Sequence, residues 1–157
     1  LMMDEVLDRD YPLFGACYGV GTVGTAIGAR IDGTYSEKPR VIEVTVTRED
    51  PLLEGVPESF NTMVGHKEAI TVLPDVATLL ATGRTCPTQM FRVQDNVYAT
   101  QFHPELAPAQ FEQRLRIYAH AGYYEPEELE DILAGTRGVD LTVDDRILRN
   151  FATRYAR

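Results

Sequence analysis

A cysteine lies where an apolar segment is expected to turn sharply into a helix, within Gly15-Ala16-Cys17-Tyr18-Gly19. Flanking glycines allow a strand and a helix to pass closely, and such a turn exposes a nucleophile in a strained conformation. The unpaired amides at the start of the helix would favour a thiolate. The pentapeptide therefore indicates a nucleophile elbow, and a buried structural cysteine beside a glycine-rich turn is the alternative.

A histidine and a carboxylate follow much later, within Gln101-Phe102-His103-Pro104-Glu105. We expect this segment at the end of a hairpin's return strand, where side chains two residues apart share a face. Glu105 could then accept a hydrogen bond from one imidazole nitrogen of His103 while the other nitrogen faces a nucleophile. With Cys17, the chain would contain a nucleophile, a base and an orienting carboxylate. A solvated surface pair is the alternative interpretation.

The glycine-rich segment also has the spacing of a dinucleotide-binding motif, at Gly19, Gly21 and Gly24. Such a site needs an acidic residue about 20 positions further on, at the end of the next strand, to bind ribose. Glu43 falls near that position but lies inside an alternating strand, at 41–47. The pattern therefore does not favour a nicotinamide site, and we expect no cofactor.

The elements that must position these residues are predicted from hydrophobic periodicity and from turn residues. We expect strands at 13–17, 41–47, 70–73, 78–82, 90–93 and 97–102, and helices after Cys17 and at 108–120, 126–135 and 142–155, with a loop and a short helical turn at 51–60. A capping box is expected at Thr142 and Asp145. This alternation predicts a three-layer α/β fold with a mainly parallel sheet and an antiparallel hairpin near its edge.

The two chemical motifs together resemble those of class I, triad-type glutamine amidotransferases, and the similarity covers about Tyr11 to Tyr118. Residues 64–69 and 73–74 resemble the subgroup that is similar to GMP synthase amidotransferases. The resemblance implies a flavodoxin-like three-layer fold. It also implies that Cys17 is the nucleophile, His103 the general acid and base, and Glu105 its orienter.

That family resemblance also implies the activity and its partners. The side-chain amide of L-glutamine would be hydrolysed through a cysteinyl thioester without a cofactor, and the ammonia would pass to an acceptor-activating synthetase. Two alternatives use the same residues. A γ-glutamyl amide or peptide hydrolase would have a different leaving amine, and a regulatory or interaction module would retain the motif without catalysis.

Several further positions are implied for the substrate pocket. The backbone amide of Tyr18 would donate to the oxyanion, next to the turn formed by Gly15 and Gly19. Gly21 stands where many members have a glutamine that contacts the substrate. His66 and Gln89 are candidates to line the glutamine pocket, as is Tyr18, although loop or packing roles remain open for all three.

The resemblance implies about two βα units, on the order of 60 residues, ahead of the nucleophile strand. Only Leu1 to Asp10 precede Tyr11 here, and the first residue is not Met. We therefore expect residues 1–157 to be one N-terminally incomplete amidotransferase domain that lacks N-terminal strands and the loop with the second oxyanion amide. Residues 123–157 would form a C-terminal helical extension.

Composition narrows the partners further. Fifteen Lys and Arg against 24 Asp and Glu give a net charge of −9, which does not favour nucleic acid or anionic lipid. No apolar stretch approaches the roughly 18 residues of a membrane span. The two cysteines, Cys17 and Cys86, lie far apart, so we expect a reducing compartment, the cytoplasm. Three scattered histidines without a metal-ligand spacing predict no metal site.

Overall fold

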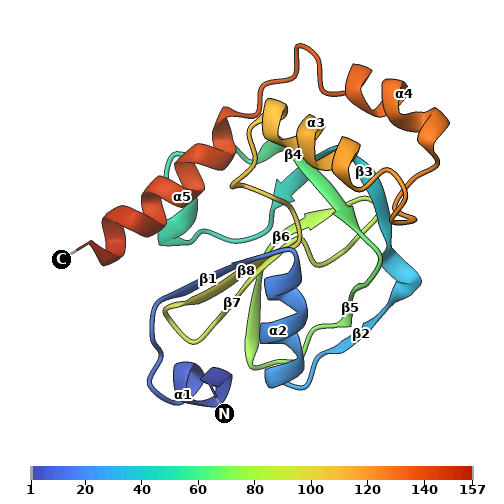
Figure 1. The fold of residues 1–157 in the computed structure, drawn as a ribbon. Helices are drawn as coiled ribbons and strands as arrows, with labels where there is room; N and C mark the ends of the chain where they lie inside the picture. Colours follow the sequence, from blue (N-terminus) through green and yellow to red (C-terminus); the bar gives the residue numbers. More distant parts are fainter. Residues whose placement is uncertain (1, 157) are drawn as a thin grey trace.

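The computed structural model describes residues 2–156, in which strands and helices are interleaved (Figure 1). The strands are β1 (Leu13–Ala16), β2 (Arg30–Asp32), β3 (Glu37–Val46), β4 (Ser59–His66), β5 (Ala69–Val72), β6 (Ala77–Gly83), β7 (Met90–Val93) and β8 (Val97–Thr100). The helices are α1 (Met2–Asp8), α2 (Tyr18–Ala26), α3 (Pro108–Ile117), α4 (Leu129–Ala134) and α5 (Thr142–Tyr155), with short 3-10 turns η1 (Gly33–Tyr35), η2 (Pro51–Leu53) and η3 (Pro126–Glu128). The predicted strand, turn and helix around Cys17 are confirmed as β1 and α2.

A six-stranded sheet in the order β1-β8-β7-β6-β3-β4 forms the centre of the fold, and β2 pairs separately with β5. Within residues 2–156, β1 and β8 run parallel, whereas the other neighbours in the large sheet run antiparallel. The α/β class and the β7–β8 hairpin are confirmed, but this part of the sheet is mixed rather than mainly parallel. Short connections join β6, β7 and β8, and a parallel pair needs a crossover of roughly a dozen residues.

Alternation along the strands gives the sheet two apolar faces. On β8, Val97 and Ala99 pack into a cluster with Val20 of α2 and with partly buried side chains of α1. Between them Tyr98 faces the opposite way and meets Phe151 of α5 edge-on, at 6.3 Å between ring centroids. The predicted three layers are therefore present, with α1 and α2 on one face and α5 on the other.

The C-terminal segment is helical, as the sequence predicts, and it packs on the body of the fold. A third apolar cluster joins Met63 of β4 to Phe111 and Leu115 of α3 and to Leu133 of α4. The start of α5 differs from the prediction, because no capping box forms there. Leu141 is the N-cap, and the carboxylate of Asp140 accepts from the amide of Thr142 at 2.9 Å.

Strand β4 has no counterpart among the predicted strands, since its first residues were expected to be loop. It pairs antiparallel with β3, from Ser59 opposite Thr45 to His66 opposite Glu37, with a shift of register between Glu37 and Arg40. Its apolar residues Phe60, Met63 and Val64 do not alternate strictly, which hides the strand in the sequence. Among the described residues no helix has both the length and the apolar character needed to cross a membrane.

Replacing Ile147 by Ala should lower the free energy of unfolding by about 2–5 kcal/mol, because the side chain is fully buried between α5 and the sheet. The exposed neighbour Arg149 provides the control, and Arg149→Ala should change stability by less than about 0.5 kcal/mol. Urea unfolding of both variants measures the difference. Equal stabilities would show that α5 is not part of the folded core.

Candidate active site

Cys17 occupies a strained turn between β1 and α2. Its backbone has φ 51° and ψ −91°, in a region that residues with a side chain rarely adopt. The Cys17 amide donates to the carbonyl of Thr100 at 2.7 Å, which fixes the turn to the end of β8. A Cβ atom at Gly15 would lie only 2.9 Å from the Cα of Gly19, so glycine is required there. The predicted nucleophile-elbow geometry is therefore present.

The other glycines of the motif have no such steric role. A Cβ atom at Gly19 or Gly21 would meet nothing within 4 Å. Neither residue lines the pocket described below, and Gly15 contributes to it only by shaping the turn.

His103 and Glu105 are hydrogen-bonded, with 2.7 Å between imidazole Nδ1 and carboxylate Oε1. The predicted pairing is present, but its cause differs from the prediction, because β8 ends at Thr100 and both residues lie in the turn that follows. The His103 amide donates to the carbonyl of Met63 on β4 at 2.9 Å and so holds the turn. A carboxylate on Nδ1 leaves Nε2 available to a second group.

The electrostatic surroundings favour a charged His103. Burial by itself would lower its pKa, but hydrogen bonds and charge interactions with Cys17 and Glu105 raise the pKa of His103 to about 9. Burial would raise the pKa of Glu105, yet the hydrogen bond and the charge of His103 hold it below its usual value. At neutral pH the pair is therefore an imidazolium beside a carboxylate, with Cys17 as the third member of the network.

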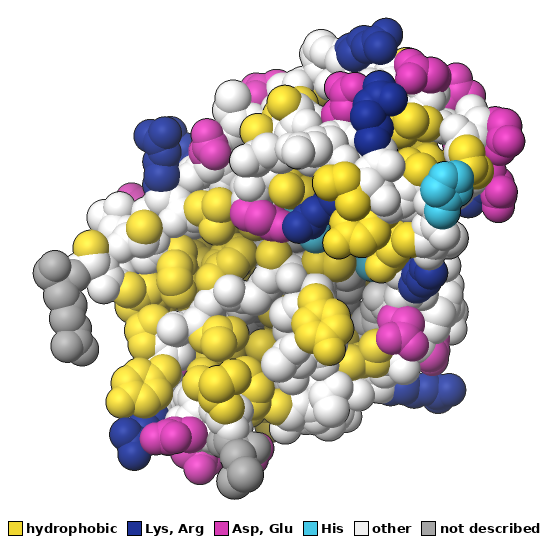
Figure 2. Space-filling view, viewed as in Figure 1, with side chains coloured by type: hydrophobic (Ala, Val, Ile, Leu, Met, Phe, Trp, Pro, Cys, Tyr) yellow, Lys and Arg dark blue, Asp and Glu magenta, His cyan; other side chains and the backbone are white. Residues whose placement is uncertain are grey.

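Cys17, His103 and Glu105 line one cavity of about 380 Å³. Its walls also include Tyr18, Gly65 and a group from α3 and the segment after it, namely Phe111, Arg114, Leu115, Tyr118, Tyr123 and Tyr124. Nη1 of Arg114 lies 3.8 Å from Oε1 of Glu105. Figure 2 shows apolar side chains gathered across the face that carries β1 and α2, with acidic side chains concentrated towards α4.

Tyr18 borders this cavity. Its side chain is exposed (87%) and its amide belongs to the first turn of α2. Amides of a first helical turn have no partner within the helix, so they can bind developing negative charge. Sequence reasoning missed Arg114 and the tyrosine-rich wall, because both lie on elements expected only to pack.

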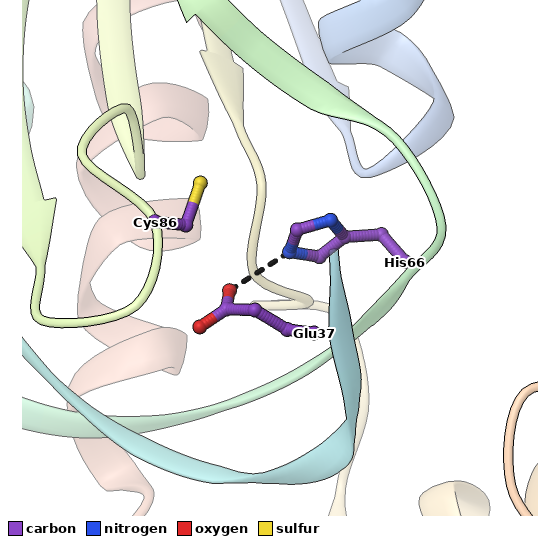
Figure 3. Close-up of side chains that lie close together, drawn as sticks. All are labelled: Glu37, His66 and Cys86. Atoms are coloured by element: carbon purple, nitrogen blue, oxygen red, sulfur yellow. Dashed lines mark hydrogen bonds and ion pairs between the residues drawn. The ribbon is translucent and has the colours of Figure 1, made fainter. Parts of the chain in front are cut away.

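His66 and Gln89, the candidates for the glutamine pocket whose loop or packing roles the sequence left open, do not line the cavity. Both are buried against Glu37, whose Oε2 accepts from His66 Nε2 at 2.8 Å (Figure 3). The same oxygen accepts from Gln89 Nε2, also at 2.8 Å. Val64 and Gly65 both border the cavity, whereas hydrogen bonds to Glu37 and to the carbonyl of Glu68 hold the His66 ring away from it.

Glu37, His66 and Cys86 have ligand atoms within 4.8 Å of one another, which is a set of residue types that can hold a metal ion (Figure 3). Their polar atoms already have protein partners, since His66 Nδ1 bonds the carbonyl of Glu68 and Cys86 Sγ donates to that of Thr88. Burial and the charge of Glu37 raise the pKa of Cys86 to about 12, whereas a metal ligand must be a thiolate. These contacts favour a hydrogen-bonded core over a metal site.

Comparison with known proteins identifies the family. The family model described as glutamine amidotransferase class-I matches residues 1–117. The chain belongs to this family. The matched region contains both the elbow and the His103–Glu105 turn.

Curated relatives of this amidotransferase chain include GMP synthases named as glutamine-hydrolysing. A GMP synthase subunit of this name from Methanosphaera stadtmanae is 28% identical over 102 residues, which are 64% of this chain and 55% of that protein. The GMP synthase of Petrotoga mobilis is 25% identical over 109 residues, 69% of this chain and 22% of that protein. The chain thus spans about half the length of the Methanosphaera relative and a smaller share of the Petrotoga one.

Solved structures share the fold. A glutamine amidotransferase from Thermotoga maritima superimposes with a TM-score of 0.79 at 20% identity, over 98% of this chain and 66% of that one. A protein from Thermoplasma acidophilum, described as resembling one GMP synthase subunit, gives a TM-score of 0.66 at 24% identity, over 97% of this chain and 61% of that one. At this identity the likeness shows the fold alone.

A chloroketone analogue of glutamine should label Cys17 in preference to Cys86. Cys17 borders the cavity and interacts with His103, whereas Cys86 is fully buried and its raised pKa keeps it a thiol. Peptide mapping of the adduct decides between the two cysteines. Equal labelling, or labelling of Cys86 alone, would contradict an activated Cys17.

Proposed function

We propose that this chain hydrolyses the side-chain amide of glutamine with Cys17, His103 and Glu105 as a catalytic triad. The observation that carries the proposal is that a cysteine on a strained elbow shares one cavity with a hydrogen-bonded His103–Glu105 pair. Membership of the class I glutamine amidotransferase family supports the same chemistry. No cofactor takes part in the proposed reaction.

The first half-reaction forms a thioester. The Cys17 thiolate attacks the amide carbon of the glutamine side chain, and the amide of Tyr18 donates to the oxyanion that forms. His103 gives its proton to the amide nitrogen, the carbon–nitrogen bond breaks, and ammonia leaves. Glu105 holds Nδ1 of His103, so the ring presents Nε2 to the reacting atoms.

The second half-reaction returns the free enzyme. Neutral His103 takes a proton from a water molecule, which attacks the γ-glutamyl thioester. The carbon–sulfur bond breaks, the Cys17 thiolate is restored, and glutamate leaves. His103 is again protonated, as its pKa of about 9 favours at neutral pH.

The destination of the ammonia is inferred from the relatives. Those in the GMP synthase group are named for glutamine hydrolysis and for GMP synthesis, and several of them are named as one subunit of that enzyme. We infer that a synthetase that activates an acceptor takes up the ammonia here. The expected cytoplasmic location remains a prediction from the cysteine content.

A γ-glutamyl amide or peptide hydrolase is the second candidate function. The observation in its favour is the aromatic lining of the cavity. Tyr118, Tyr123, Tyr124 and Phe111 give the cavity an aromatic wall, which ammonia as a leaving group does not require. The triad would act in the same way on a larger amine. Comparing kcat/KM for glutamine with that for γ-glutamyl anilides or peptides separates the two functions.

Substitutions in the triad should lower glutamine hydrolysis to different extents. Cys17→Ser and His103→Ala should each lower kcat by about a hundredfold or more, because the nucleophile or the proton carrier is lost. Glu105→Gln should cost less than His103→Ala, since the amide still contacts the ring. Steady-state glutaminase assays measure this order, with Cys86→Ala as the unaffected control. Unchanged rates in the His103 and Glu105 variants would contradict the assignment, and a parent protein that never acylates Cys17 would favour a non-catalytic module.

The pH profile should report the raised pKa of His103. Because the imidazolium protonates the leaving nitrogen, kcat/KM should fall as pH rises through about 9. An ordinary histidine would give a fall near pH ~6.5. In Glu105→Gln the fall in kcat/KM should occur at lower pH, because one of the groups that raise the pKa of His103 is gone. If kcat/KM of the parent enzyme falls at the pH of an ordinary histidine, the result would contradict the proposed ion pair.

A further inference from the structure

The outer edge of β4 contacts both halves of the candidate triad. In the sheet order β4 is the last strand, so this edge faces the turns rather than another strand of the large sheet. The carbonyl of Met63 accepts from the amide of His103 at 2.9 Å, and that of Gly65 accepts from Cys17 Sγ at 3.9 Å. Residues two apart on a strand direct their carbonyls to the same side, so one straight segment meets both residues.

His66 is the last residue of β4, and contacts at both of its ring nitrogens hold its side chain in place. Nδ1 lies 3.0 Å from the carbonyl of Glu68, which can only accept, so Nδ1 must donate. Nε2 lies 2.8 Å from Oε2 of Glu37, a group whose pKa is lowered overall, because three hydrogen bonds and the charge of His66 outweigh burial. The His66 ring is therefore held between the carbonyl of Glu68 and the buried carboxylate of Glu37.

Glu37 connects this histidine to the segment that leads to His103. Besides His66, its carboxylate accepts from Thr85 Oγ1 and from Gln89 Nε2. The carbonyl of Gln89 in turn accepts from the amide of Gln101 at 2.8 Å, two residues before His103. The Glu37 side chain is fully buried, so moving the carboxylate would disturb contacts on every side.

We propose that the Glu37–His66 pair is a positioning device that fixes the end of β4, so that Gly65 stays against Cys17 Sγ while the Met63 carbonyl holds the amide of His103. The proposal rests on the proposed role of Cys17 as nucleophile. Neither Glu37 nor His66 lines the cavity, so neither touches the substrate. Their effect passes through the backbone of β4.

Two substitutions at Glu37 separate position from charge. Glu37→Asp keeps the charge but withdraws the carboxylate from His66 by one carbon. Glu37→Gln removes the charge and keeps the length of the side chain. The contact with His66 can persist, because Nε2 of a neutral His66 can accept a hydrogen bond from the new amide. Oε1 of Gln89 is buried without a partner, so the Gln89 amide can turn and accept from the introduced side chain. Position, rather than charge, should therefore decide the outcome.

The experiment measures alkylation of Cys17 by iodoacetamide together with glutaminase kinetics, in a Cys86→Ala background. That background leaves Cys17 as the one cysteine of the sequence. It is also the reference for the Glu37 variants, because the Cys86 side chain lies beside the Glu37–His66 pair but donates its hydrogen bond to the Thr88 carbonyl. Melting temperatures are recorded, and every rate is taken well below unfolding. Thr85→Val, at an exposed position, removes one hydrogen-bond donor to Glu37. It replaces Glu37→Asp as the test variant if Glu37→Asp does not fold.

Glu37→Asp should lower the alkylation rate and kcat by about tenfold or more with KM within about threefold, and Glu37→Gln should stay within about 1.5-fold of the background. Thr85→Val should lower both rates by about threefold. Rates that match the background in Glu37→Asp, or equal losses in Glu37→Asp and Glu37→Gln, would overturn the proposal. Alkylation does not need glutamine. If the parent fails to hydrolyse glutamine while alkylation follows this pattern, the proposed function fails and the positioning role stands.

Discussion

The parallel pairing of β1 with β8 is the constraint on which the site depends. Its register sets Ala16 opposite Thr100, and one step beyond it the Thr100 carbonyl accepts from the amide of Cys17. That hydrogen bond ties the strained residue to a buried strand, so the surrounding fold offsets the cost of its conformation. The same strand ends three residues before His103. One strand pair therefore places the proposed nucleophile and the proposed base at the same end of the sheet.

Strand β4 supplies the second constraint, from the opposite edge of the sheet order. Its carbonyls at Met63 and Gly65 meet the segments that carry His103 and Cys17. Gly65 borders the cavity, whereas His66 joins a buried polar core with Glu37. The buried polar residues Glu37 and His66 thus support the part of β4 that borders the cavity.

The local features of the site could be predicted from the sequence, because they depend on neighbouring residues. Gly15 before Cys17 allows the close turn. The His103–Glu105 hydrogen bond was predicted correctly, although it forms in the turn after β8 rather than along a strand. The placement of His66 could not be predicted, because it depends on β4, whose imperfect alternation hid the strand. The sheet directions and the tyrosine-rich wall were also beyond prediction, since both depend on how distant segments pack.

Direct detection of the acyl-enzyme tests the central claim most sharply. The protein is mixed with glutamine, quenched in acid within the first turnovers, digested and analysed by mass spectrometry. A γ-glutamyl group is expected on the peptide that contains Cys17, present with glutamine and absent with glutamate or in Cys17→Ser. Hydrolysis of glutamine with no adduct on Cys17, or with the adduct on another residue, would contradict the proposed role of Cys17.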